Sequence, residues 1–176
     1  MICRAIHTTA DFDYAHTLVF SEGALDKLKE LIKSGAAIVT DTNMALSGIN
    51  KKTLAVFGCE AKCLMADETV AKLAKEQKTT RAAVSMEIAA SWNKPTIFVV
   101  GNAPTALIEL YDMIEKGIYK PAFVIGVPVG FVNVEAAKEL IMETGVPYIV
   151  NVGRKGGSNI AAAICNALIY SLVDRG

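Results

Sequence analysis

The sequence lacks the features that mark several common classes of protein. Its 176 residues include 18 basic and 18 acidic side chains, so the formal net charge is zero. A dedicated nucleic-acid binder needs an excess of lysine and arginine to neutralise phosphates, and this composition argues against one. The longest apolar stretches, 121–134 and 161–173, are interrupted by Gly, Pro or Asn and are shorter than the roughly 20 residues that span a bilayer. We therefore expect no membrane-spanning helix.

Metal-binding and secretory signals are also scarce. The thiol and imidazole side chains are few: Cys3, Cys59, Cys63, Cys165, His7 and His16. No CxxC pair occurs among them, so we expect free thiols, no structural zinc and no metal site. The first 14 residues contain no apolar segment followed by a small-residue cleavage site, and the expected location is therefore cytoplasmic.

Several catalytic signatures are missing as well. No predicted strand is followed by GxGxxG, and the chain has no GKS or GKT at the spacing of a phosphate-binding loop. GxSxG and HExxH are likewise absent from the sequence. A nucleotide-binding enzyme stays only as a weak alternative, which predicts thermal protection by a nucleotide.

What is present is a regular alternation of short apolar runs and longer amphipathic segments. The apolar runs predict strands at 36–41, 62–66, 96–101, 122–127 and 148–153. The segments between and around them predict helices at 23–34, 68–77, 80–92, 104–116, 134–144 and 158–173. This order predicts one α/β domain over 1–176, a three-layer sandwich with a mostly parallel central sheet of about five strands and helices on both faces.

The first 20 residues do not fit this alternation, and they predict an extra strand or an extended arm. An extended RAIHTT segment would place Ala5 and His7 on one face and Arg4 on the other. Histidine exchanges protons near neutral pH, so His7 and His16 are each candidates for a catalytic or a structural role.

Polar residues follow the predicted strands, where open parallel sheets bind ligands. The strand exits carry Asp41 to Asn43, Asp67, Gly101 and Asn102, 126–133 and 153–158. Helix capping is the alternative role for Asp41 or Thr42, Asp67, Asn102 and Ser158.

The RKGGSN segment is the most distinctive exit. Two glycines let the backbone approach a ligand, and two cations beside a helix start favour an anion. Arg154, Gly156, Gly157 and Ser158 therefore predict a carboxylate or phosphate clamp, with a solvated basic turn as the alternative. Arg81, behind two threonines at the start of another helix, is either a surface charge or an anion ligand.

Six segments together resemble the precorrin-8X methylmutase family, also called cobalt-precorrin-8 methylmutase. They are RAIHTTADFDY, VTDTNMALSGIN, KTTRAAV, VVGNAPTAL, VIGVPVGFVNVEAAKE and GRKGGSNIAAAICNAL. The likeness runs in the family's order from Ile2 to near the C-terminus.

The resemblance implies an isomerase of cobalamin biosynthesis with a three-layer α/β fold. Its substrate is a corrin-like tetrapyrrole, in which a methyl group moves from C11 to C12 to give hydrogenobyrinic acid or its cobalt form. It also implies no cofactor and a homodimer. A non-catalytic corrinoid-binding protein is the alternative within the same resemblance.

The resemblance also assigns site residues. His7 matches the histidine of the family's IHT motif and becomes the general acid, while His16 lies outside that motif. Arg81 matches the TTR segment, and Arg154 with Gly156, Gly157 and Ser158 matches the glycine-rich carboxylate-binding loop. Asn43, Asn102 and Thr105 are expected to donate further hydrogen bonds to the acid arms.

In one respect the sequence departs from the family pattern. Relatives usually carry a helical segment ahead of the IHT motif that helps cover the substrate, whereas only a few residues precede His7 in this sequence. The expected domain at 1–176 therefore lacks that cover, which puts full activity and tight binding in question.

Overall fold

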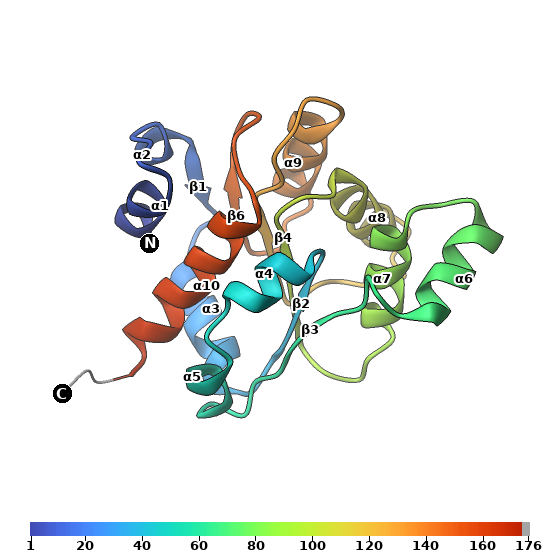
Figure 1. The fold of residues 1–176 in the computed structure, drawn as a ribbon, viewed down its shortest axis with the longest axis horizontal. Helices are drawn as coiled ribbons and strands as arrows, with labels where there is room; N and C mark the ends of the chain where they lie inside the picture. The colour runs from blue at the N-terminus through green and yellow to red at the C-terminus, as the bar shows by residue number, and fades with distance from the viewer. Residues whose placement is uncertain (174–176) are drawn as a thin grey trace.

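The computed structural model describes residues 1–173, in which one six-stranded sheet forms the central layer (Figure 1). The strands lie in the order β1, β6, β5, β4, β2, β3. Their bounds are Leu18–Phe20 for β1, Ala37–Thr40 for β2, Ala61–Cys63 for β3, Thr96–Val100 for β4, Phe123–Gly126 for β5 and Tyr148–Asn151 for β6. All neighbours pair in parallel except β1, which runs antiparallel to β6. The predicted parallel sheet is confirmed, with one strand more than expected.

The predicted helices are confirmed within a few residues at each end, and four short helices add to them. The helices are α1 Ile2–Thr9, α2 Tyr14–Thr17, α3 Ala24–Lys33, α4 Asn43–Gly48, α5 Lys51–Ala55, α6 Glu68–Gln77, α7 Arg81–Ala90, α8 Pro104–Glu115, α9 Val134–Glu143 and α10 Ser158–Ser171. No helix within residues 1–173 has both the length and the apolar character needed to cross a membrane.

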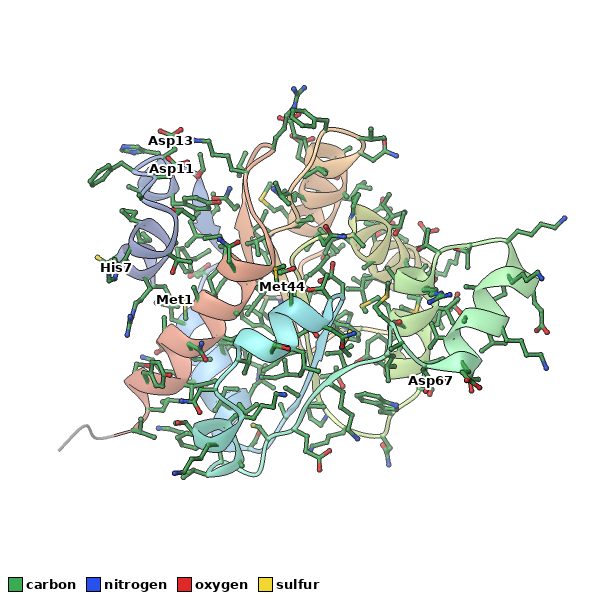
Figure 2. All side chains as sticks on the ribbon, viewed as in Figure 1. Met1, His7, Asp11, Asp13, Met44 and Asp67 are labelled. Carbon is green, nitrogen blue, oxygen red and sulfur yellow. The ribbon has the colours of Figure 1, made fainter. Side chains whose placement is uncertain are left out.

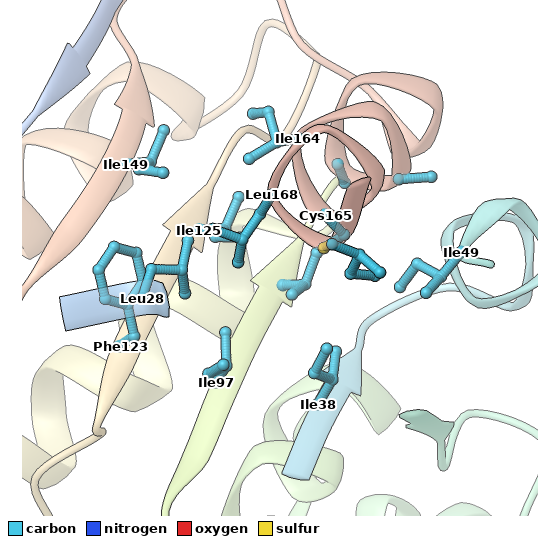
Figure 3. Packing of buried hydrophobic residues seen from close by; sticks show 14 of the residues in the cluster. Leu28, Ile38, Ile49, Ile97, Phe123, Ile125, Ile149, Ile164, Cys165 and Leu168 are labelled. Carbon is cyan, nitrogen blue, oxygen red and sulfur yellow. The ribbon is translucent and has the colours of Figure 1, made fainter. Parts of the chain in front are cut away.

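The sheet has a packed core on each of its faces, because successive side chains of a strand point to opposite sides. Ile97 and Val99 of β4 face α3 and α10, and they belong to the cluster shown in Figure 3. Phe98 and Val100 face the other way, toward α7, α8 and α9. All four side chains are at most 1% exposed. The fully apolar strands seen in the sequence are thus explained by helices on both sides.

The first 20 residues form two short helices and an edge strand. The extra strand expected there is confirmed as β1, in which Leu18 pairs with Asn151. The extended RAIHTT segment is wrong, since these residues lie in α1. The reason is the helical spacing of Ile2, Ala5 and Ile6, which together pack into the core beside α10.

Candidate functional site

A buried carboxylate organises the edge where the parallel strands end. Asp41 follows β2 and is 1% exposed. Its two oxygens accept hydrogen bonds from the backbone N–H groups of Gly101, Asn102 and Ala103 at 2.8, 2.8 and 2.6 Å. Burial raises the pKa of this carboxyl group, and the three donors oppose that effect. Asp41 therefore fixes the path of the chain between β4 and α8.

The start of α10 is held against the same edge. The hydroxyl groups of Thr42 and Ser158 lie 2.7 Å apart, which joins the N-termini of α4 and α10. Gly101 lies so close to α10 that an added Cβ atom would come within 2.8 Å of the Ser158 Cα. Only glycine fits this approach, so the strand exit and the helix start form one compact unit.

The glycine-rich loop lies against the loop that follows β5. Gly157 donates its N–H to the carbonyl oxygen of Val127 at 2.8 Å, and Gly130 donates to the Arg154 carbonyl at 3.2 Å. A side chain at Gly156 would collide with the backbone carbonyls of Val127 and Pro128. Glycine is therefore required at position 156 for the two loops to meet.

Next to this edge is a cavity of about 500 Å³ between α1, α4 and α10. Its size is typical of sites for organic ligands. It is lined by Arg4, Thr8, Met44, Gly48, Ser158, Asn159, Ala162, Ala163, Asn166 and Tyr170. The guanidinium of Arg4 lies 6.0 Å from the centre of the Tyr170 ring. The wall thus combines a cation, hydroxyl and amide groups with apolar surface.

His7 lies outside the wall of this cavity. Its side chain is exposed on the outer side of α1, where Figure 2 labels it, while Arg4 and Thr8 of the same helix line the cavity. His16 is exposed in α2. The imidazole of His7 can therefore reach only a ligand that extends beyond the cavity over α1.

A second polar group joins the starts of α7 and α8. Thr80 Oγ1 and Thr105 Oγ1 lie 2.9 Å apart. Arg81 follows as the first residue of α7, with its side chain exposed and without a hydrogen-bond partner in the described part of the chain. Arg81 and Thr105 belong to the same edge of the sheet but not to the wall of the α1–α4–α10 cavity.

Arg154 is exposed on the glycine-rich loop. Its Nε donates to Glu135 Oε2 at 2.9 Å, and its guanidinium lies 5.7 Å from the centre of the Phe131 ring. The two terminal nitrogens have no acceptor among residues 1–173. Arginine binds a carboxylate best through two parallel N–H bonds, and these nitrogens are available for that geometry.

Capping accounts for only part of the polar residues at the strand exits. Thr42 and Asp67 accept N-cap bonds, from the N–H groups of Ala45 and Thr69. The capping role of Asn102 and Ser158 is wrong, since Ala103 and Gly157 occupy those positions. The exposed side chains of Asn43 and Asn102 bond to no group in the described residues and are available to a ligand.

Sequence reasoning missed most of the cavity wall. Arg4 and Thr8 are four residues apart and share one face of α1. An extended RAIHTT segment would not place Arg4 and Thr8 on one helical face, although the spacing of Ile2, Ala5 and Ile6 favours a helix. Met44, Asn159 and Asn166 had no signal of their own, because each lies on a helix whose orientation only the fold defines.

The fold and this edge define an α/β protein whose polar side chains, backbone N–H groups and cations gather beside one cavity, an arrangement suited to an anionic organic ligand. A family model described as precorrin-8X methylmutase matches residues 1–171. The chain belongs to this family, whose members are isomerases that move a methyl group within one molecule in cobalamin biosynthesis.

Curated relatives and solved structures agree with the family. The chain is 47% identical to the cobalt-precorrin-8 methylmutase of Salmonella typhimurium, over 98% of this chain and 80% of that protein. It is 44% identical to the enzyme of the same name from Leptospira interrogans, over 100% of this chain and 84% of that protein. The precorrin-8X methylmutase structure from Thermus thermophilus matches with a TM-score of 0.84 and 42% identity, over 96% of this chain and 83% of that chain. These relatives do not favour a non-catalytic corrinoid-binding protein.

Proposed function

We propose that this protein converts precorrin-8X, or its cobalt form, by moving the methyl group from C11 to C12 of the macrocycle. The observation that carries the proposal is that α1, which bears His7, lines the cavity together with α4 and α10. The relatives from Salmonella typhimurium and Leptospira interrogans are named cobalt-precorrin-8 methylmutases, which supports the cobalt form as substrate. The metal travels with that substrate and needs no protein ligand.

His7 acts as the general acid in this proposal. Its imidazolium protonates the conjugated macrocycle near the migrating centre, which makes the ring system electron-poor. The methyl group then moves with its bonding electrons by a [1,5]-sigmatropic shift, and His7 takes the proton back, so no net proton is consumed. A well-placed acid contributes about 10² to 10⁴ in rate. Holding the macrocycle in a reactive geometry supplies a further contribution.

The acid arms of the substrate are held along the edge of the sheet. Arg154 offers its two terminal nitrogens, and Arg81 its whole guanidinium. Asn43, Asn102 and Thr105 offer amide and hydroxyl groups, and the loop at Gly156, Gly157 and Ser158 offers backbone N–H groups. Substrate arms spread over this edge would bring part of the macrocycle over α1, where His7 is exposed.

We also propose a cytoplasmic homodimer. The biosynthetic relatives support the location. The exposed apolar side chains of Val129, Phe131 and Val132 support a second copy covering the loop after β5. Light scattering at micromolar concentration tests this directly: a mass of one chain would reject the dimer.

Replacing His7 by alanine tests the mechanism. We expect methyl migration to fall by about 10² to 10⁴ while hydrogenobyrinic acid still binds, because the acid and not the binding edge is removed. Conversion is followed by the colour change of the pigment, and binding by absorbance titration. His16→Ala is the matched control, an exposed histidine on the neighbouring helix, and should convert substrate normally. Undiminished turnover by His7→Ala would remove His7 from the mechanism.

A further inference from the structure

Lys138 is a buried lysine for which the methyl shift gives no role. It lies in α9 and is fully buried, which is unusual for a lysine without a carboxylate partner. Its Nζ donates to the carbonyl oxygens of Gly153 at 2.6 Å and Lys155 at 2.9 Å. Burial lowers the pKa of Lys138 from 10.5 to about 8, and nearby Glu135 acts in the opposite direction. The ammonium thus remains mostly charged at neutral pH, directly beneath the glycine-rich loop.

The two bonds determine how the loop presents its backbone. In a trans peptide, the C=O of one residue and the N–H of the next point in opposite directions. Since the carbonyls of Gly153 and Lys155 point at Lys138, the N–H groups of Arg154 and Gly156 point away from it. Neither N–H has an acceptor within residues 1–173. Backbone N–H groups of a glycine-rich loop that lack protein acceptors are suited to bind an anion.

Other contacts keep the loop in the same orientation. Asn151 Nδ2 also donates to the Lys155 carbonyl, at 2.8 Å. Gly157 bonds to Val127 on the far side of the loop. Because the Lys138 ammonium lies on the carbonyl side, its charge also adds to the attraction of the loop for an anion.

We infer that Lys138 is a positioning residue for substrate binding, which turns the N–H groups of Arg154 and Gly156 outward to receive a carboxylate arm. The inference rests on the proposed function, in which the glycine-rich loop holds the acid arms. Lys138 itself touches no substrate. Its effect belongs to affinity and not to the protonation step, which separates it from His7.

The test compares Lys138→Met with the wild-type protein, using hydrogenobyrinic acid as the binding probe. We expect Kd and KM to rise about tenfold, with kcat at saturating substrate changed less than threefold. Partial unfolding would reduce the fraction of active protein, which lowers the apparent kcat and leaves KM unchanged. A rise in KM with little change in kcat therefore indicates a positioning role and not a loss of structure. Lys138→Arg, which keeps a cation and its donors, should restore most of the affinity. Lys116→Met, at the exposed lysine that follows α8, is the control and should bind normally.

Backbone amide signals distinguish failure of this inference from failure of the proposed function. In the wild type, hydrogenobyrinic acid should shift the ¹H–¹⁵N signals of Arg154 and Gly156, and Lys138→Met should lose those shifts. Absence of the shifts in the wild type would reject the loop as the carboxylate site. Wild-type shifts combined with unchanged affinity in Lys138→Met would reject the role of Lys138 alone. Should the methionine variant fail to fold, Lys138→Leu, which also removes both donors, replaces it, and wild-type affinity there would overturn the inference.

Discussion

Two regions of the molecule differ in where their polar contacts lie. At the edge of the parallel strands these contacts are buried, whereas those that join the N-terminal layer, made of α1, α2 and β1, to the glycine-rich loop lie at the surface. At the edge, the Asp41 carboxylate is buried and accepts three backbone N–H bonds. The N-terminal layer is joined to the glycine-rich loop by Lys155, whose Nζ lies 2.6 Å from Asp11 Oδ2 and 2.5 Å from Asp13 Oδ2 on the surface. Losing a buried polar partner costs several kcal/mol, whereas exposed ion pairs add little.

The comparison assigns the two regions different tasks. The edge is rigid because its buried charged groups, Asp41 and Lys138, are hydrogen-bonded inside the protein, so it can keep backbone N–H groups at fixed positions for a ligand. The N-terminal layer carries His7 on a helix of eight residues, Ile2–Thr9, which packs on α10. Its ion pairs to the glycine-rich loop lie at the surface, so substitutions of those charged residues should change catalysis more than stability.

Asp41→Ala should give the largest loss of stability. It leaves three N–H groups of residues 101–103 without their acceptor in a buried site, at a cost of about 3 to 5 kcal/mol in the free energy of unfolding. Urea unfolding measures this change. Asp67→Ala is the matched control, since it removes an N-cap bond at an exposed site and should cost only about 1 kcal/mol. Equal losses in the two variants would show that the buried Asp41 bonds stabilise the fold no more than an exposed N-cap bond.

The stability contributed by Lys138 should depend on pH. Lys138 bonds to the glycine-rich loop from inside the protein, whereas Lys155 of the same loop forms its ion pairs at the surface. The folded-state pKa is about 8, below the ordinary 10.5, so burying the charged form opposes folding. Between these values the unfolded chain binds a proton that the folded chain has released, so stability rises with pH. The gain reaches at most about 3 kcal/mol.

The matching measurement is urea unfolding of the wild type and Lys138→Met at pH 7, 8, 9 and 10. We expect the stability of the wild type relative to the variant to be constant below pH 8 and to rise above it. The variant subtracts the other groups that titrate in this range. Glu135, Arg154 and Lys155, together with Asp11 and Asp13, which pair with Lys155, remain in both proteins. Parallel curves throughout would show that Lys138 does not titrate with a lowered pKa.

The same contrast explains how much the sequence could predict. Apolar runs such as 96–101 and amphipathic segments such as 68–77 carry their own periodicity, so the parallel sheet and its long helices were predictable. The extended structure expected for the segment 2–9 is wrong because Ile2, Ala5 and Ile6 form an apolar helical stripe that the short RAIHTT pattern does not include in full. That error hid Arg4 and Thr8, which meet α10 only through a helix.

Candidate residues at strand exits were predictable as a group, because parallel strands bring their carboxyl ends to one edge. The sequence could not show that Asp41 holds the 101–103 backbone instead of capping α4, since this bond spans 60 residues. Nor could it show that Lys138 supports the glycine-rich loop. The sequence pattern alone gives Lys138 as an ordinary surface residue of an amphipathic helix, and it is buried only because α9 packs on its neighbours and on the glycine-rich loop.

Arg154→Ala should affect ligand affinity and leave the fold intact. The guanidinium is exposed and only its Nε is engaged, by Glu135, so its loss leaves no buried group unpaired. We expect the affinity for hydrogenobyrinic acid to weaken by about 1.5 to 3 kcal/mol, the scale of a charged hydrogen bond. Absorbance titration measures it. Glu135→Gln, which keeps Arg154 but weakens its anchor, should have a smaller effect, and an unchanged Kd for Arg154→Ala would return that residue to the solvated-turn interpretation.

Lys155→Met should have the smallest effect on stability and a selective effect on the N-terminal layer. Both ion pairs lie at the surface, where water screens them, so the unfolding midpoint should barely move. The Asp11 carboxylate makes two contacts. One oxygen accepts the N–H of Asp13 at 3.0 Å, which stabilises the turn between α1 and α2, and the other pairs with Lys155. Without the lysine we expect faster amide hydrogen exchange across residues 10–16, together with a few-fold lower kcat, because the helix bearing His7 loses its tie to the binding loop.

Lys27→Met, which removes an ion pair of 3.0 Å within α3, is the matched control and should leave both measurements unchanged. If exchange at residues 10–16 stays as slow as in the wild type, the surface pairs do not position the N-terminal layer, which is then held by the packing of α1 on α10 and the pairing of β1 with β6.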